Sequence, residues 1–247
     1  MRTLFIYLIL IIIAKESVCQ CGDNVSIIPN SGFELLADGM TEPDNANQFY
    51  KALDWSNGTA GSIDYYSTEA YPGGQPPPPN GSEHFVRGRF RTQNSNYIEY
   101  IASCLTEDLE PENNYNLLIS EGTTPSGPDF EVDVIVLGVN HCDFPLSGSV
   151  CIEDDFPEIG RQYISLEYGE WKNISIPIVL NESYSSVIIG LSCTSDFEAS
   201  DGDFLFDDVC LIKELTTSVN SNAIEESNFQ LYPNPSNGVL NLSLIHI

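Results

Sequence analysis

The chain is poor in positive charge, with 9 lysine and arginine residues against 36 aspartate and glutamate residues in a length of 247. The net charge of -27 repels nucleic acid and anionic lipid, which excludes both as partners. Two interpretations remain open: a soluble protein of a salty or extracellular medium, or clusters of carboxylates that bind divalent cations. Hydrophobic residues make up 42% of the chain, enough to bury a core, so wholesale disorder is not expected.

Motifs of the common enzyme classes are absent. The sequence has no Gly-x-Ser-x-Gly, no His-Glu-x-x-His and no phosphate-binding loop. Apart from position 246, only His84 and His141 offer an imidazole. A carboxylate pair for glycoside hydrolysis stays open, because acids are abundant and their spacing in space is not visible in a sequence. We therefore do not expect an enzyme.

Only one long apolar run is present, at residues 4–13. It is shorter than the roughly 20 residues that span a bilayer. With Arg2 before it and a polar stretch after it, it predicts a secretory signal peptide over residues 1–19, cleaved after Cys19. The letters "ESVC" could suggest a lipid-anchored cysteine, but Glu16 and Val18 fit that pattern poorly. Cleavage removes two basic residues and one acidic residue, so the mature net charge is (9−2)−(36−1) = −28.

The even number of cysteines fits an exported chain. Cleavage leaves six, which predicts disulfides: Cys21, Cys104, Cys142, Cys151, Cys193 and Cys210. Six cysteines allow about 15 connectivities, and sequence alone does not choose among them. We expect one bond between Cys142 and Cys151, closing the short loop "HCDFPLSGSVC". The letters "HCD" could instead belong to a metal or nucleophile site.

Helical periodicity is nearly absent, and only residues 46–53 fit a short helical turn. Strands separated by Gly, Pro, Asn and Asp are expected at residues 97–105, 115–122, 130–139, 171–180, 185–193 and 203–212. In the last two segments, both sets of alternate positions carry apolar residues, as in central strands that are buried on both faces. Pro177 places its strand at an edge or a bulge. Many strands without crossover helices predict an all-β fold, an antiparallel jelly-roll β-sandwich.

The main domain is expected to cover residues 20–213. Within it, residues 71–82 form a proline-stiffened loop, with a peptide-like ligand for an aromatic groove as the alternative. Residues 214–228 are polar and lack strand alternation, which indicates a linker. Residues 229–241 combine strand starts with a Pro-Asn-Pro turn and an Asn-Gly turn, which by themselves indicate only β-structure.

The segment "LYPNPSNGVLNL" resembles the opening of the C-terminal sorting domain of the type IX (Por) secretion system. The residues that carry the resemblance are Leu231, Tyr232, Pro233, Asn234, Pro235, Asn237 and Gly238. The resemblance implies that residues 229–241 begin a second small β-domain, the sorting domain. It also implies type IX secretion machinery as a partner, and an extracellular or outer-surface location in a Gram-negative bacterium. The following letters "LSLIHI", residues 242–247, match the translation of a common transposase sequencing adapter, so the sorting domain is expected to be truncated here.

The main domain resembles galactose-binding-like jelly rolls, among them calcium-containing carbohydrate-binding modules. The resemblance lies in "NSGFE" at 30–34, Trp55, "WKNISIPI" at 171–178 and "FDDV" at 206–209. It implies a structural calcium ion held by Glu34 and Asp207, with Ser31 and Asp38 completing the shell. A second resemblance, on Trp55 and the segment "DYY" at 64–66, is to an uncharacterised exported domain that often precedes type IX tails, and it implies no activity.

Candidate ligand residues are aromatic or basic. Trp55 and Trp171 are expected in the core, whereas Tyr65, Tyr66 and Tyr71 lie in loop-like sequence and could stack on sugar rings. Arg87, Arg89 and Arg91 share one parity and hence one face of a strand. That face could clamp a carboxylate or sulfate of an anionic polysaccharide, or it could tie down surrounding acids through surface ion pairs.

Three function classes follow. The first is a non-catalytic secreted or cell-surface binding module, with glycans or polysaccharides as ligands. The alternative is a structural or adhesive surface protein without a small ligand. A glycoside-active enzyme is the least favoured.

Overall fold

A computed structural model of the chain describes residues 21, 24–71, 78, 81–91, 97–123, 130–146, 151–167, 169–193 and 201–214. The chain divides into two units between residues 215 and 216, and all described residues belong to the first. The expected signal peptide, most of the linker, the sorting motif and residues 242–247 lie outside the described residues. The domain boundaries given above therefore stay predictions.

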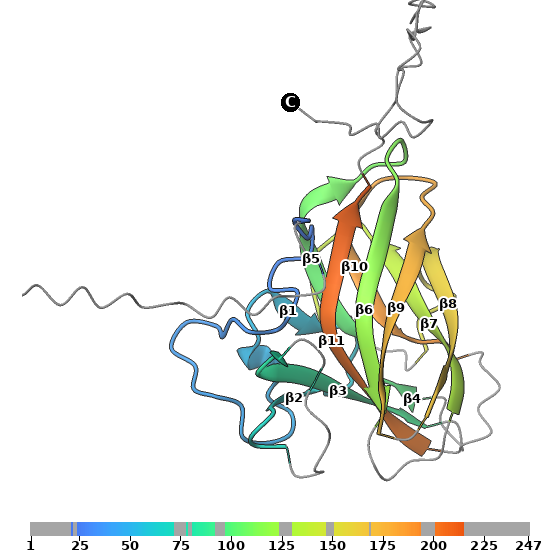
Figure 1. Cartoon of the computed structure of the whole chain (residues 1–247). Coiled ribbons are helices and arrows are strands. Elements are labelled where there is room, and N and C mark those ends of the chain that lie inside the picture. Colours follow the sequence, from blue (N-terminus) through green and yellow to red (C-terminus); the bar gives the residue numbers. More distant parts are fainter. Residues whose placement is uncertain are drawn as a thin grey trace, which may run out of the picture. The chain divides into compact units, whose positions relative to one another are not determined.

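The described residues form two antiparallel sheets (Figure 1). One has five strands in the order β1-β5-β10-β7-β8, with bounds Trp55–Asn57, Ile101–Leu109, Tyr184–Leu191, Phe130–Val139 and Glu158–Leu166. The other is six-stranded, in the order β2-β3-β11-β6-β9, with bounds Asp64–Ser67, His84–Arg91, Asp201–Lys213, Tyr115–Thr123 and Trp171–Ile178. Its remaining strand, β4 (Tyr97–Ile98), pairs with β3.

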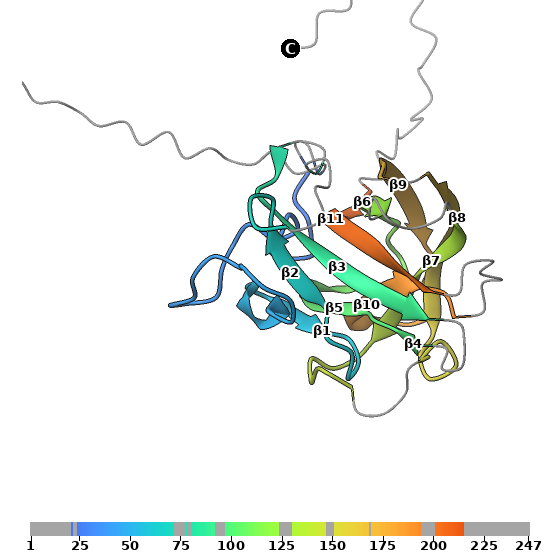
Figure 2. The same ribbon diagram turned by 90° about the horizontal axis from the view of Figure 1, so that it is seen from below.

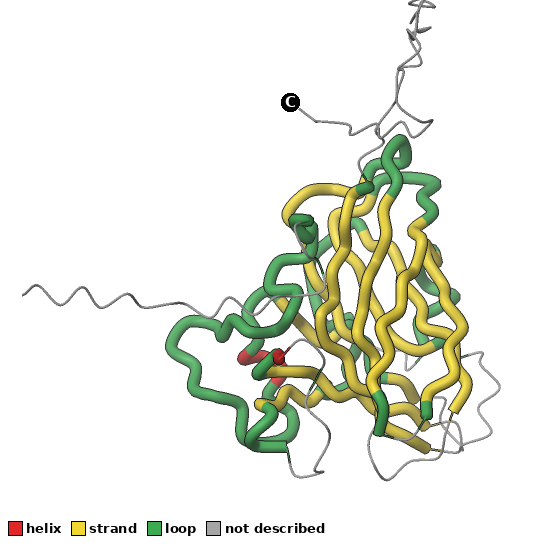
Figure 3. The backbone as a smooth tube through the Cα atoms, in the orientation of Figure 1, coloured by secondary structure: helices red, strands yellow, loops and turns green. Residues whose placement is uncertain are grey.

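The two sheets stack as the layers of a jelly-roll β-sandwich, which confirms the expected fold class. From β5 onward the chain crosses repeatedly between the sheets: β5, β7, β8 and β10 belong to one sheet and β6, β9 and β11 to the other. Figure 3 shows strands dominating the described chain. The one helical element among the described residues is the 3-10 turn Phe49–Lys51. This turn lies within the predicted helical stretch at 46–53.

Most expected strands are present, and three are additional: β1, β2 and β8. β10 and β11 lie at the centres of their sheets, and Pro177 is exposed on the edge strand β9, as predicted. β2 forms in sequence that looked like a loop, and β1 and β8 were not predicted at all. β11 carries a bulge: the ladder to β6 jumps from Asp207 to Cys210, and Asp208 has a left-handed φ of 50°.

The core fills the space between the sheets. Alternate residues of each strand point inward, and large rings from β2, β3 and β11 meet there, among them Tyr65, Phe90, Phe204 and Phe206. Gly88 of β3 leaves room for one of them, because a Cβ there would lie 2.0 Å from the ring of Phe204. Trp55 is also in this core, as predicted.

One ionisable side chain lies in the interior without a partner. Glu121 of β6 is fully buried, and neither of its carboxylate oxygens makes a hydrogen bond. Burial raises the pKa of Glu121 well above its ordinary value, because an ion in a low-dielectric interior is costly. Lys172 stands opposite it on β9, but its ammonium donates to the carbonyl of Ser165 instead.

The six cysteines among the described residues all form disulfides, and the one predicted bond is not among them. The bonds are Cys21–Cys210, Cys104–Cys142 and Cys151–Cys193. The predicted Cys142–Cys151 bond is wrong, because sheet order outweighs the short sequence separation. β10 holds β5 and β7 on its two sides, and its Ser186 is opposite both Cys104 and Val139, which brings the segment after β7 close to Cys104.

Among the described residues, the search for a helix of membrane-spanning length and apolarity finds none.

Candidate functional site

The predicted calcium ligand Glu34 binds a histidine. Its Oε1 accepts the amides of Glu83 at 2.9 Å and His84 at 3.2 Å, and its Oε2 lies 3.0 Å from Nδ1 of His84. The other ring nitrogen, Nε2, lies 2.6 Å from Oε2 of Glu42. Burial alone would lower the pKa of His84, but the two carboxylates outweigh it, so this pKa lies above its ordinary value. A buried imidazolium therefore links Glu34 to the loop that carries Glu42.

The second predicted calcium ligand, Asp207, is buried at the bulge of β11. Its Oδ1 accepts the amide of Asp208 at 2.7 Å, whereas its Oδ2 is buried without a hydrogen bond. Burial raises the pKa of Asp207 well above its ordinary value, and the charges of Asp208 and Glu34 raise it further. The carbonyl of Ser31 reaches the same bulge, where it accepts the amide of Val209 at 2.8 Å. Glu34, Asp207 and Ser31 are thus neighbours.

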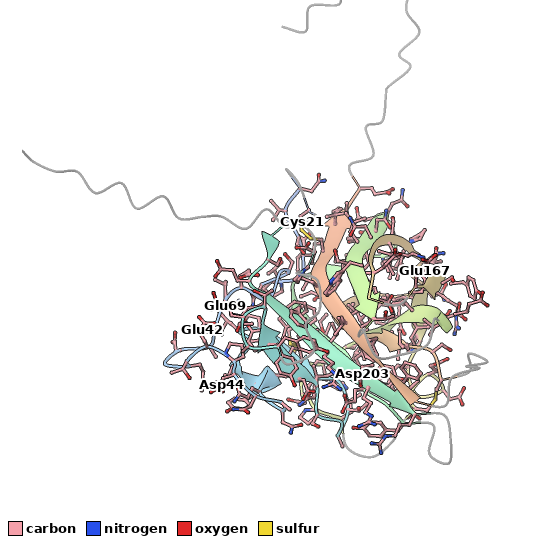
Figure 4. The ribbon with its side chains drawn as sticks, turned by 60° about the horizontal axis from the view of Figure 1, so that its bottom comes forward. Cys21, Glu42, Asp44, Glu69, Glu167 and Asp203 are labelled. Atoms are coloured by element: carbon pink, nitrogen blue, oxygen red, sulfur yellow. A yellow bond between two sulfur atoms is a disulfide. The ribbon has the colours of Figure 1, made fainter. Side chains whose placement is uncertain are left out.

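An acidic pocket lies beside this cluster. Its volume is about 660 Å³, and its lining includes Glu42, Asp44, Glu69, Glu83 and His84. Figure 4 shows Glu42, Asp44 and Glu69 together on one side of the molecule. Asp38, the fourth predicted calcium ligand, is exposed and is not among the lining residues.

The outer face of the six-stranded sheet carries a second apolar cluster, separate from the core. This aromatic cluster consists of Tyr66, Tyr71, Phe85, Trp171 and Leu205. Phe85 of β3 lies at its centre, and the rings of Tyr71 and Trp171 stand edge-on to it at 5.3 and 6.0 Å between centroids. Phe85 is buried, whereas Tyr71 and Trp171 are half-buried. The cluster therefore presents two partly open rings.

Trp171 was expected in the core, and that expectation is wrong. The tryptophan opens β9, and its outward position in the ladder is opposite Gly122 of β6. A Cβ at Gly122 would lie 2.9 Å from the indole, so the missing side chain is what allows the ring to lie over the sheet.

A charged network borders the aromatic cluster. Arg87, two residues after Phe85 on β3, donates from Nη1 to Oδ2 of Asp64 at 3.2 Å and from Nη2 to Oδ2 of Asp203 at 2.6 Å. Burial lowers the pKa of Arg87, but the hydrogen bond and charge of Asp203 outweigh it, so the guanidinium stays charged. Burial raises the pKa of Tyr71, whose hydroxyl also feels the charges of Arg87 and Asp203. The network and the half-buried ring are therefore close.

The same network forms one wall of a polar pocket, which we call the arginine pocket. Its volume is about 300 Å³, and its lining includes Asp64, Arg87, Arg89, Arg91, Tyr97, Glu99 and Asp203. Figure 2 shows β2, β3 and β11, which supply most of these residues, side by side, and Figure 4 marks Asp203 on β11.

Glu99, which lines the arginine pocket, is held in place by three hydrogen bonds. It is buried, and its carboxylate accepts the amide of Ser62 at 3.0 Å, the amide of Arg89 at 2.9 Å and the hydroxyl of Tyr97 at 2.6 Å. Burial and the hydrogen bond to Glu99 raise the pKa of Tyr97 to about 12, so this hydroxyl stays protonated and donates.

The predicted ligand residues separate into two groups. Tyr66, Tyr71, Arg87 and Arg89 lie on the outer face or line the arginine pocket. Tyr65 points the other way, because β2 alternates from Asp64 onward. It is buried in the core, where its hydroxyl donates to the carbonyl of Phe33 at 2.5 Å. Tyr65 therefore cannot stack on a ligand.

Several residues of this face were not predicted, among them Asp64, Tyr97, Glu99 and Asp203. A partial signal was available: the ligand candidate Tyr66 is two residues from Asp64, and a strand there would have placed both on one face. Nothing in the sequence signals Asp203, which reaches Arg87 across 116 residues of chain.

One further group of potential metal ligands lies close together within the described residues: Cys151, Glu153 and Cys193. The two cysteines are joined in a disulfide and offer no thiolate. Glu153 is already bound by the hydroxyl of Ser192 at 3.1 Å and by Arg161 at 3.3 Å. This group is a structural contact rather than a metal centre.

Neither a protein-family profile nor a curated protein sequence matches the chain. Solved structures with a similar course of the backbone include one described as "CBM4 structure and function", at 13% identity and a TM-score of 0.40, covering 76% of this chain and 99% of that one. Another is the CBM22-1 xylan-binding domain of Paenibacillus barcinonensis Xyn10C, at 9% identity and a TM-score of 0.42, covering 70% and 97%. A third is a putative sugar binding protein of Bacteroides thetaiotaomicron, at 10% identity and a TM-score of 0.44, covering 77% and 100%.

Proposed function

We propose that this protein is a non-catalytic glycan-binding module whose ligand lies on the outer face of its six-stranded sheet. The observation that carries the proposal is the pairing of two half-buried rings, Tyr71 and Trp171, with a pocket of fixed polar groups. A sugar ring presents apolar C–H groups on its faces and hydroxyls around its edge. An aromatic face complements the C–H groups of the sugar, and charged donors and acceptors beside it complement the hydroxyls.

The polar groups of the face are held in place before any ligand arrives. Arg87 is fixed between Asp64 and Asp203, and the amide of Asn47 binds the other oxygen of Asp64 at 2.7 Å. Such preorganisation favours binding, because little conformational freedom remains to be lost.

The same contacts oppose a hydrolytic role. A glycosidase needs one carboxylic acid to protonate the leaving group and one carboxylate as base or nucleophile. Asp64 and Asp203 both bind Arg87, and Glu99 accepts three hydrogen bonds. Carboxylates committed in this way support a ligand-positioning role rather than proton transfer.

A glycan array with the full chain tests the proposal. We expect saturable binding to a defined sugar, weakened in Trp171→Ala and Tyr71→Ala. Tyr163→Ala is the matched control, because Tyr163 is an exposed tyrosine of β8 in the other sheet. Silence across the array would favour a structural or adhesive surface protein. Hydrolysis of a chromogenic glycoside panel would favour an enzyme.

We also propose export by type IX secretion to the cell surface or the medium. The three disulfides support an oxidising location, because such bonds persist outside the cytoplasm. The sorting motif at residues 231–238 is the reason for naming the type IX route. A fusion of residues 1–241 to a complete sorting domain should appear outside cells only when the host has the type IX translocon. Equal export without it would contradict the route.

A structural calcium ion is a further part of the proposal. Asp207 offers a buried oxygen without a hydrogen bond, with the carbonyl of Ser31 and the carboxylate of Glu34 nearby. Oxygen ligands of this kind suit calcium, which would offset the repulsion between the carboxylates. At free calcium about 100 times the dissociation constant, the gain in stability would be about 2.7 kcal/mol. Equal melting temperatures with calcium and with chelator, or a shift that persists in Asp207→Asn, would contradict it.

A further inference from the structure

Positive charge is concentrated on one strand face. After signal cleavage the chain keeps seven basic residues, nine minus Arg2 and Lys15, and three of them are Arg87, Arg89 and Arg91. They occupy alternate positions of β3 on the outer face and all line the arginine pocket. Three like charges spaced two residues apart along a strand repel one another, so each needs a counter-charge from the protein or from a ligand.

Elsewhere the protein supplies such counter-charges in excess. Arg161 of β8 has carboxylates of Asp133, Glu153 and Glu158 around one guanidinium. Arg87 has two, Asp64 and Asp203. In a chain so rich in carboxylates, an arginine is expected to form an ion pair.

Arg89 is different. Its guanidinium is exposed, and among the described residues no carboxylate pairs with it. Two carboxylates, those of Asp203 and Glu99, belong to residues close enough to pair with Arg89. Asp203 stands directly opposite Arg89 in the ladder, but its carboxylate turns to Arg87. Glu99 accepts the backbone amide of Arg89 and two further hydrogen bonds, from Ser62 and Tyr97. Both nearby carboxylates thus bind other groups, and within the described part of the chain the Arg89 guanidinium faces the pocket without an ion pair.

We propose that the arginine pocket binds an acidic sugar unit, a uronic acid carboxylate or a sulfate ester, and that Arg89 is the residue that selects it. This rests on the glycan-binding function proposed above. A guanidinium forms paired, charge-assisted hydrogen bonds with a planar carboxylate or a sulfate oxygen pair. The pocket volume of about 300 Å³ lies at the lower end for small-molecule sites. Tyr97 and the Arg87 network offer further donors and acceptors for the hydroxyls of the same unit.

Three polymers of related sugars test the inference: neutral galactan, polygalacturonate and carrageenan. Binding to the full chain is measured by calorimetry at about 0.15 M salt, where the screening length of about 8 Å suppresses the long-range repulsion from the acidic protein. We expect an acidic polymer to bind more tightly than galactan. Polygalacturonate and carrageenan distinguish the carboxylate from the sulfate as the ligand group.

Two substitutions with equal charge change sharpen the result. Arg89→Gln should weaken binding of the acidic polymer roughly 10- to 100-fold, the usual value of hydrogen bonds to charged groups. Lys213→Gln removes the same charge near the opposite end of β11 and should leave affinity unchanged. Arg89→Lys should restore only part of the affinity, because an ammonium lacks the planar fork.

The outcomes separate this inference from the function on which it rests. If galactan binds as tightly as the acidic polymers, and Arg89→Gln binds it equally well, glycan binding stands and acidic selectivity is overturned. If acidic polymers bind but Arg89→Gln and Lys213→Gln weaken them alike, selection by Arg89 is overturned. If no polymer or array glycan binds, both proposals fall.

Discussion

The two faces of β3 differ in what the fold requires of them. The inward residues Val86, Gly88 and Phe90 are buried in the core, where the neighbouring side chains limit the size of each residue. On the outward side, Phe85 contacts two other rings edge-on, and the guanidinium of Arg87 pairs with two carboxylates. The guanidinium of Arg89 pairs with no carboxylate among the described residues. Packing two sheets together explains the first set and none of the second. The arrangement of the outward residues therefore points to a functional requirement.

The largest expected effect lies on the inward face. Phe90→Ala should lower the free energy of unfolding by about 3–5 kcal/mol, because it opens a cavity between the sheets. Arg89→Ala, its exposed neighbour, should change that free energy by less than about 0.5 kcal/mol. Urea unfolding followed by circular dichroism measures both. Equal losses would remove the distinction between the two faces.

The disulfide at the ends of the domain tests whether inward packing alone maintains the fold. Replacing Cys21 and Cys210 together by serine should lower the free energy of unfolding by about 2–5 kcal/mol. Peptide mapping without reductant should still show Cys104 linked to Cys142 and Cys151 linked to Cys193. A peptide linking Cys142 to Cys151 would contradict the observed pairing.

An inward-facing acid gives a pH test. Burial raises the pKa of Glu121 above its ordinary value of 4.5. Between that value and the raised one, the native state holds a proton that the unfolded state has lost, so stability falls as pH rises. The slope that this group adds is about 1.4 kcal/mol per pH unit.

Glu121→Gln should remove that part of the slope and should be more stable than the parent chain at pH 7. Chemical denaturation at several pH values above 4.5 measures it. Glu131→Gln on the exposed surface of β7 is the matched control. Parallel pH profiles for the parent chain and Glu121→Gln would show that Glu121 is ionised or solvated.

The smallest effect on stability is expected on the outward face. Gly122→Ala brings a methyl group to 2.9 Å from the indole of Trp171, which is half-buried and can move away. Stability should change by less than about 1 kcal/mol, below the usual cost of overpacking a core. Tryptophan emission should shift and glycan affinity should fall. As a control, Trp171→Phe isolates the emission of Trp55. An unchanged Trp171 emission in Gly122→Ala would show that Gly122 does not determine the position of the indole.

Local patterns in the sequence predicted much of the fold. Alternation identified β7, and apolar residues on both parities identified the central strands β10 and β11, because burial leaves a periodic trace along one strand. β1 and β2 were missed because three or four residues are too short to show a period. β8 was missed because Gly160, Arg161 and Gln162 interrupt the apolar positions.

The site was only partly predictable, because it depends on which strands become neighbours. The parity of β3 correctly placed Arg87 and Arg89 on one face. Asp203 and Asp64 reach that face only because β11 and β2 lie on the two sides of β3. The disulfides were mispredicted for the same reason: order within a sheet is a property of the whole chain, not of the segment between two cysteines.

The bond between Cys21 and Cys210 also has a mechanical consequence. It joins the beginning of the described chain to the last strand, across a sequence separation of 189 residues. A pulling force applied before residue 21 and after residue 210 would pass through this covalent link and bypass β1 to β10. Under tension the sandwich would behave as a closed ring, able to bear load without unfolding, as long as the sulfur–sulfur bond is intact.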